Sequence, residues 1–282
     1  MMNPQDQENK RTIRDLAIFT VVVATSGWLG YGLDRLLNVP PTMQPGLLLW
    51  LIAPLVTVLL LRAFAGDGWK DFGLGPAFKG NAIWYGVSLL IYPFVGALVL
   101  LIGGIFGLVT FPNFSLVLLF SVFGMGLIQS FVKNIFEEFS WRGYLTPKVS
   151  SLSLNAYVGH MITGLIWTSW HIAYWLFILG PAPIRFATGQ SLATFIPLAI
   201  LNLMVVSIAY GEIRLLTNSV WPLVIMHTIG NALIDPLIAQ GLVHITTGSF
   251  LAPLYQSILT PVFFLAAGIW LHQRRVRLQL AG

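Results

Sequence analysis

The sequence predicts an all-α polytopic membrane protein, a bundle of about eight transmembrane helices with a cavity open to the cytoplasm. Of the 282 residues, 56% are hydrophobic and only 9% are charged, and the mean hydropathy is +0.80. Soluble domains are about half apolar and about a quarter charged. The apolar residues also fall into separate runs, each close to the roughly 20 residues that a helix needs to cross a bilayer.

Eight of these runs are long enough to be spans: residues 16–37, 45–64, 82–108, 116–137, 157–180, 192–213, 220–240 and 250–271. A polar N-terminal tail, residues 1–15, precedes the first run. That run lacks an evident small-residue cleavage site, so we interpret it as a retained signal anchor. With no internal repeat or linker, residues 1–282 are predicted to form a single domain.

The basic residues predict the orientation of these spans. With the N-terminus in the cytoplasm, only Arg35 and Arg185 fall outside. This bias requires both termini to be cytoplasmic and the number of spans to be even. The uneven distribution of basic residues accounts for the net charge of +5 through membrane topology. We therefore expect a lipid bilayer as partner and no nucleic acid. In a prokaryote the location would be the plasma or inner membrane. The cytoplasmic basic residues are Lys10, Arg11, Arg14, Arg62, Lys70, Lys79, Lys133, Arg142, Lys148, Arg214, Arg274, Arg275 and Arg277.

The first polar cluster lies at the end of the fourth run. Glu138 and Arg142 are four residues apart, so on a helix they share a face and can form an ion pair. Glu137 projects about 100° away and is left without this partner. Ionisable groups at bilayer depth are candidates for functional sites. The alternative is an ion pair at the membrane interface with one spare carboxylate.

Two further clusters lie in later runs. His171 is near the middle of the run 157–180, among aromatic residues; the alternative is a hydrogen-bonded histidine of the core. His227 and Asn231 are four residues apart and share one helix face. Polar side chains on such a face can also hold membrane helices together without any catalytic role.

Together the three clusters supply the groups that hydrolysis of a peptide bond requires. Glu137 is the candidate general base, and His171 can orient the attacking water or transfer a proton. His227 and Asn231 can donate hydrogen bonds to the oxyanion. Glu138 and Arg142 are then a supporting pair. The absence of cysteine excludes a cysteine nucleophile, disulfides and thiolate metal ligands.

A metal-dependent mechanism is the second possibility. Glu137, His171 and His227 have the donor atoms that bind zinc, with a water at an open position. The His-Glu-x-x-His motif of many zinc proteases is absent. The residues therefore leave open whether the cofactor is zinc or none.

The fourth run raises a question of depth. If this span begins at Leu116, Glu137 reaches the inner interface, whereas His171 lies near the middle of its own span. A start near Ser121, or a kink, would move Glu137 deeper and let the groups meet. We therefore expect a water-filled cavity that opens to the cytoplasm.

The three motifs, in this order, resemble the CAAX prenyl protease and bacteriocin-processing (CPBP) family of intramembrane proteases, which includes the type II CAAX prenyl endopeptidases. The family pattern Glu-Glu-x-x-x-Arg, aromatic-x-x-x-His and His-x-x-x-Asn is matched by Glu137-Glu138-x-x-x-Arg142, Trp167-x-x-x-His171 and His227-x-x-x-Asn231. The resemblance covers residues 130–235. Phenylalanine is common where this chain has Trp167, a departure that we expect not to affect the chemistry.

The resemblance implies an eight-helix bundle with a conical cavity and an endopeptidase that cleaves a peptide or lipidated peptide substrate. Glutamate and the first histidine would activate water, and the second histidine and asparagine would stabilise the oxyanion. Both metal-dependent and glutamate-dependent mechanisms are attributed to the family. Prenylated substrates are expected for eukaryotic members, whereas many bacterial members are linked to peptide maturation or immunity.

The alternative function is a non-catalytic immunity or scaffold protein that keeps the same bundle. A transporter is disfavoured because the chain has no inverted repeat. Four further polar residues remain without an assigned role: Asp235, His160, Glu212 and His244.

Overall fold

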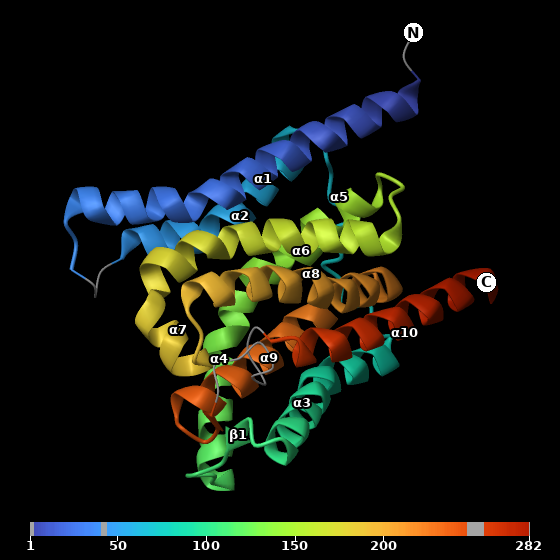
Figure 1. Cartoon of the computed structure of the whole chain (residues 1–282). Coiled ribbons are helices and arrows are strands. Elements are labelled where there is room, and N and C mark those ends of the chain that lie inside the picture. The colour runs from blue at the N-terminus through green and yellow to red at the C-terminus, as the bar shows by residue number, and fades with distance from the viewer. Residues whose placement is uncertain (1–2, 41–43, 247–256, 282) are drawn as a thin grey trace.

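The computed structural model describes residues 3–40, 44–246 and 257–281 (Figure 1). Its α-helices are α1 (Pro4–Leu37), α2 (Pro45–Phe64), α3 (Ala82–Ile105), α4 (Leu116–Ser140), α5 (Thr146–Ser150), α6 (Ala156–Ala173), α7 (Pro181–Thr188), α8 (Leu192–Thr217), α9 (Trp221–Ala239) and α10 (Leu259–Ala281). Two π-helical turns, η1 (Trp141–Leu145) and η2 (Tyr174–Leu179), continue α4 and α6, and β1 (Val109–Thr110) pairs antiparallel with β2 (His244–Ile245).

The all-α polytopic fold is confirmed. Within the described residues, seven helical segments are long and apolar enough to cross a membrane, and they correspond to the first seven predicted spans. The eighth prediction, 250–271, begins outside the described residues, and its described part runs into α10. The polar tail is largely helical, because α1 begins at Pro4. The N-terminal end of α1 and the C-terminal end of α10 lie on the same side of the bundle (Figure 1).

The predicted end of the fourth span at Glu137 is wrong. The helix begins at Leu116, so the proposed later start near Ser121 is also wrong. It continues through η1 and α5 as one segment to Ser150. Glu137 therefore lies inside this helical segment. A start later than Leu116 is not required to place it there. A π-helical turn follows directly, and such turns are frequent at functional sites.

The long helices form a closed series in which each packs on the next. Following the contacts, α1 lies against α2, α2 against α4, α4 against α9, α9 against α3, α3 against α10, α10 against α8, α8 against α6, and α6 returns to α1 (Figure 1). The sequence order is therefore not the spatial order. The three motifs lie on α4, α6 and α9. These helices are separated in sequence, but the fold brings the motifs into one region.

Small residues let the helices that carry the motifs approach closely. A Cβ atom placed on Gly126 of α4 would lie 3.0 Å from Cα of Ala232 in α9. A Cβ atom on Gly164 of α6 would lie 2.5 Å from the backbone oxygen of Leu203 in α8. Close backbone contact at small residues is a common way of packing membrane helices.

Two buried arginines hold the π-helical turn η1 in place. Arg62 of α2 donates to the backbone oxygens of Gly143 at 2.8 Å and Gly68 at 2.6 Å. Arg214 of α8 donates to the backbone oxygen of Arg142 at 2.8 Å and also to that of Asp71. Arg62 and Arg214 thus bind both the loop between α2 and α3 and the turn η1, which follows the two glutamates.

Candidate active site

Glu137 lies in a pocket of hydrogen-bond donors. Its Oε1 is 2.9 Å from Nζ of Lys133, one turn earlier on α4. Its Oε2 accepts from the indole nitrogens of Trp167, at 3.2 Å, and Trp141, at 3.4 Å. The side chain is only 2% exposed. The expectation that Glu137 has no partner is therefore wrong: both oxygens are bound, because a buried carboxylate must be compensated by charge or by hydrogen bonds.

Glu138 forms the predicted ion pair with Arg142, at 3.0 Å. The same oxygen, Oε1, is also 2.8 Å from Nδ1 of His227 in α9. Since a carboxylate paired with an arginine is ionised and only accepts hydrogen bonds, His227 carries its hydrogen on Nδ1. Glu138 therefore joins α4 to α9 as well as bracing its own helix. Sequence spacing indicated the local pair but gave no signal for the histidine.

Arg142 packs against two aromatic rings. Its guanidinium carbon lies 4.2 Å from the ring centroids of both Trp167 and Tyr210. The side chain is fully buried. Nε and Nη2 of Arg142, and Oε2 of Glu138, have no hydrogen-bond partner among the described residues. The ion pair and the two cation–π contacts thus supply the compensation for this buried charge.

His171 is fixed by its own helix. Its Nδ1 is 3.1 Å from the backbone oxygen of Trp167. Because a carbonyl oxygen only accepts, Nδ1 donates, and the neutral ring carries its lone pair on Nε2. The ring stacks on Trp175, with centroids 5.2 Å apart. His171 is half-buried, and the carboxylate of Glu137 interacts electrostatically with both His171 and His227.

Asn231 belongs to a short amide chain that crosses from α9 to α4. Its Nδ2 donates to Oδ1 of Asn134 at 3.3 Å. Asn134 in turn donates to the hydroxyl of Thr228 at 3.4 Å. Asn134 is fully buried and lies one turn before Glu137. Asn134 was not among the predicted site residues, although a polar amide inside an apolar run was a usable signal.

Trp167 contacts residues of all three motifs. Its indole nitrogen binds Glu137, and its backbone oxygen binds His171. Its ring lies 5.4 Å from the His227 ring, edge to face, in addition to its contact with Arg142. Phenylalanine has no N–H and could not donate this hydrogen bond to the carboxylate, so the effect of tryptophan at this position on the chemistry stays to be tested.

The donor geometry does not fit the zinc site that the residue types suggested. Among the described residues, no group of three or more histidine, aspartate or glutamate side chains is arranged to hold a metal ion. Glu137, His171 and His227 share a region, but hydrogen bonds from Lys133 and two indoles occupy the carboxylate. We derive no step through a metal.

Two of the residues left unassigned form a second buried cluster. Glu212 of α8 binds His160 of α6 at 3.0 Å, and His272 and Arg275 of α10 at 2.9 Å and 2.6 Å. This cluster connects three helices, and none of its hydrogen bonds or ion pairs among the described residues involves a residue of the candidate site. His244 lies in β2, paired with Thr110. The side chain of Asp235 is outside the described residues.

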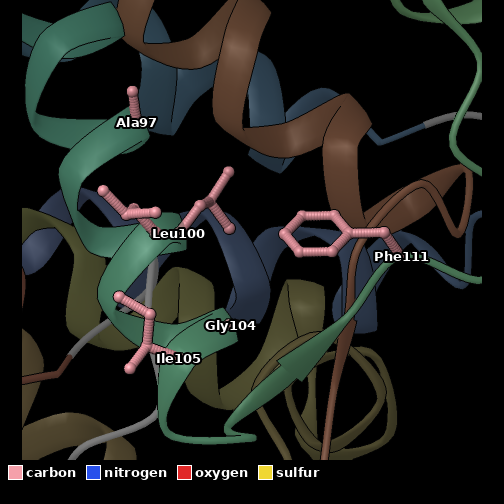
Figure 2. A pocket seen from close by; sticks show the side chains of 6 residues that line it. Ala97, Leu100, Gly104, Ile105 and Phe111 are labelled. Atoms are coloured by element: carbon pink, nitrogen blue, oxygen red, sulfur yellow. The ribbon is translucent and has the colours of Figure 1, made fainter.

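Two hollows of the described surface lie away from the site. One, of about 500 Å³, is lined by apolar side chains of α3 and by Phe111 after β1, as Figure 2 shows. Another, of about 570 Å³, lies between α1 and α2 near Arg14 and Asp15. No residue of the candidate site lines either of them. The cavity expected around Glu137 and His171 stays a prediction.

Fold and site together define the class: a polytopic α-helical membrane protein that buries carboxylates, imidazoles and an arginine between its helices. Residues 119–233 match the family model described as "Type II CAAX prenyl endopeptidase Rce1-like", so an Rce1-like domain is detected in this part of the chain. The match contains all three motifs, and it supports a role as a CAAX-type intramembrane protease. No curated protein matches the chain.

Proposed function

We propose that the protein is an intramembrane endopeptidase that hydrolyses a peptide bond of a membrane-associated substrate, with a prenylated C-terminal peptide as the first candidate. The observation that carries this proposal is the contact of Trp167 with Glu137, His171 and His227 inside the Rce1-like domain. Three motifs separated in sequence thereby meet around one side chain. Their group types are those that amide hydrolysis needs.

In the proposed reaction a water molecule attacks the scissile carbonyl carbon. Glu137 accepts one proton from this water, whose oxygen forms the new bond, and the carbonyl π electrons move to oxygen as the oxyanion. His171 accepts a hydrogen bond from the same water at Nε2, since Nδ1 is occupied by the Trp167 carbonyl. When the carbon–nitrogen bond breaks, the proton held by Glu137 passes to the leaving amine.

The oxyanion would be bound from α9. The amide nitrogen of Asn231 has two hydrogens, one of which is donated to Asn134. The second is the donor that we assign to the oxyanion. His227 can donate from Nε2 only when its ring carries a proton on both nitrogens, because Nδ1 already donates to Glu138. Glu138 and Arg142 support this arrangement and do not touch the substrate.

We also propose the topology. The thirteen-to-two distribution of basic residues places both termini in the cytoplasm. The same orientation places the end of α4 that carries Glu137 toward the cytoplasmic half, where a cavity would admit the peptide. Lysine modification of intact and permeabilised cells at Lys10, with detection by mass spectrometry, tests this orientation: protection only in intact cells is expected.

The proposal is tested with the purified protein and a fluorogenic farnesylated peptide, beside the same peptide without the lipid. Wild-type turnover that falls to background in Glu137→Ala and persists in Glu8→Ala, an exposed carboxylate, is the expected result. Because no three donors among the described residues are arranged to hold a metal ion, turnover should survive a strong zinc chelator. Full activity of Glu137→Ala would overturn the role of the carboxylate, and chelator-sensitive turnover restored by zinc would overturn the metal-free mechanism.

One observation favours the non-catalytic alternative. Both oxygens of Glu137 are bound by protein donors, as in a purely structural buried carboxylate. An immunity or scaffold protein would capture its partner equally well with Glu137→Ala and would cleave neither peptide. Absence of turnover with both peptides, together with unchanged partner capture, would replace the protease by this function.

A further inference from the structure

Among the donors to Glu137 in the described part of the chain, only the indole of Trp167 comes from another long helix. Lys133 and Trp141 lie four residues before and after Glu137. Trp167 reaches it from α6, across 30 residues of sequence, with the shorter of the two indole hydrogen bonds. The position of the carboxylate relative to α6, which also carries His171, therefore depends on this contact.

The rest of the Trp167 side chain is fixed as well. The residue is 3% exposed, and its ring contacts both the Arg142 guanidinium and the His227 imidazole. An indole packed in this way cannot rotate without leaving these contacts. Its N–H is thus aimed at Oε2 of Glu137 before any substrate arrives.

Resting on the proposed function, we propose that Trp167 is a positioning residue that acts through Glu137: its indole N–H orients the carboxylate toward the water that His171 also binds. A general base must lie within hydrogen-bond reach of the proton that it accepts, and small displacements of a reacting group are costly. Trp167 itself touches no reacting atom. Its contribution should therefore appear in kcat and leave substrate binding unchanged.

The substitution Trp167→Phe isolates the N–H. Phenylalanine keeps an aromatic ring beside Arg142 and His227, and the bond that holds His171 survives because it uses the backbone oxygen. The matched control is Trp50→Phe. Trp50 is also a buried indole, but it donates to the backbone oxygen of Trp170 at 2.8 Å. Both variants lose one buried indole hydrogen bond, and only one loses it from Glu137.

With the peptide that the wild type cleaves, Trp167→Phe should lower kcat by about tenfold or more, because hydrogen bonds to charged groups are among the strong ones. KM should stay within about twofold of wild type. Trp50→Phe should lower the melting temperature and leave kcat within about twofold. A raised KM with unchanged kcat in Trp167→Phe, or equal losses of kcat in both variants, would overturn the proposal.

A second measurement needs no activity. The chain has 10 tryptophans, and the indole ¹⁵N–¹H resonance of Trp167 can be identified by its loss in Trp167→Phe. It should move in Glu137→Gln, whereas the Trp50 resonance should stay. An unmoved Trp167 resonance would refute the contact even if the protein is an active protease. A moved resonance without wild-type turnover would refute the proposed function and leave the contact standing.

Discussion

His227 donates its Nδ1 hydrogen to Oε1 of Glu138 over 2.8 Å, and the same oxygen accepts from Arg142 at 3.0 Å. One buried carboxylate oxygen thus connects an imidazole of α9 with a guanidinium of its own segment. The histidine tautomer follows from this bond, because a carboxylate oxygen cannot donate. Glu138 is consequently more than a brace for Arg142: it also sets which nitrogen of His227 faces the site.

Glu138→Gln should reduce both stability and activity. The amide leaves Arg142 as a buried cation without its counter-charge, and breaking a buried pair costs about 3–5 kcal/mol in the free energy of unfolding. Thermal unfolding in detergent checks the first effect, and kcat at a temperature where the variant is folded checks the second. Glu8→Gln, at an exposed position, is the control. A Glu138→Gln protein as stable as Glu8→Gln would contradict the burial argument.

Asn231→Ala should lower kcat by about 100- to 1,000-fold if its amide donates to the oxyanion. Asn134→Ala should have a smaller effect, since Asn134 holds the amide of Asn231 but is not assigned to the substrate. Steady-state kinetics of the two variants on one peptide make the comparison. A larger loss of kcat in Asn134→Ala than in Asn231→Ala would mean that the two roles are exchanged.

Gly126→Leu should separate α4 from α9. Its new side chain would meet the backbone of Ala232, because a Cβ atom at this position already lies 3.0 Å from Cα of Ala232. Overpacking of this kind costs about 1–3 kcal/mol in the free energy of unfolding. Gly124 is the matched control, because a Cβ atom there meets nothing within 4 Å. We expect Gly124→Leu to keep the wild-type melting temperature and Gly126→Leu to lower it. Identical melting temperatures would show that this crossing tolerates displacement.

Arg275→Ala should weaken the packing of α10 and leave catalysis unchanged. Arg275 binds both oxygens of the buried Glu212, at 2.6 Å and 3.1 Å, from a cluster without contact to Glu137. Removing it leaves a buried carboxylate with its two histidines, so the melting temperature should fall while kcat stays near wild type at lower temperature. Arg277→Ala, at an exposed position two residues later, is the control. A loss of kcat without a loss of stability would connect this cluster to the reaction.

Features of the protein that depend on composition and on short spacing could be predicted from the sequence. Apolar runs predicted seven segments that the described structure contains as long helices, because the length of a spanning helix follows from the thickness of the bilayer. The four-residue spacing of Glu138 and Arg142 predicted their ion pair, because such residues share a helix face. The order of the motifs indicated a resemblance to the family whose model matches residues 119–233.

Tertiary structure alone decided which of two adjacent carboxylates meets which partner. Glu138 binds a histidine 89 residues away, Glu137 an indole 30 residues away, and Asn231 an amide 97 residues away. These pairings depend on how α4, α6 and α9 are rotated and how closely they cross. Helical periodicity assigns residues to faces of one helix, but the rotation of that face toward a neighbour is set by packing of side chains from the whole bundle.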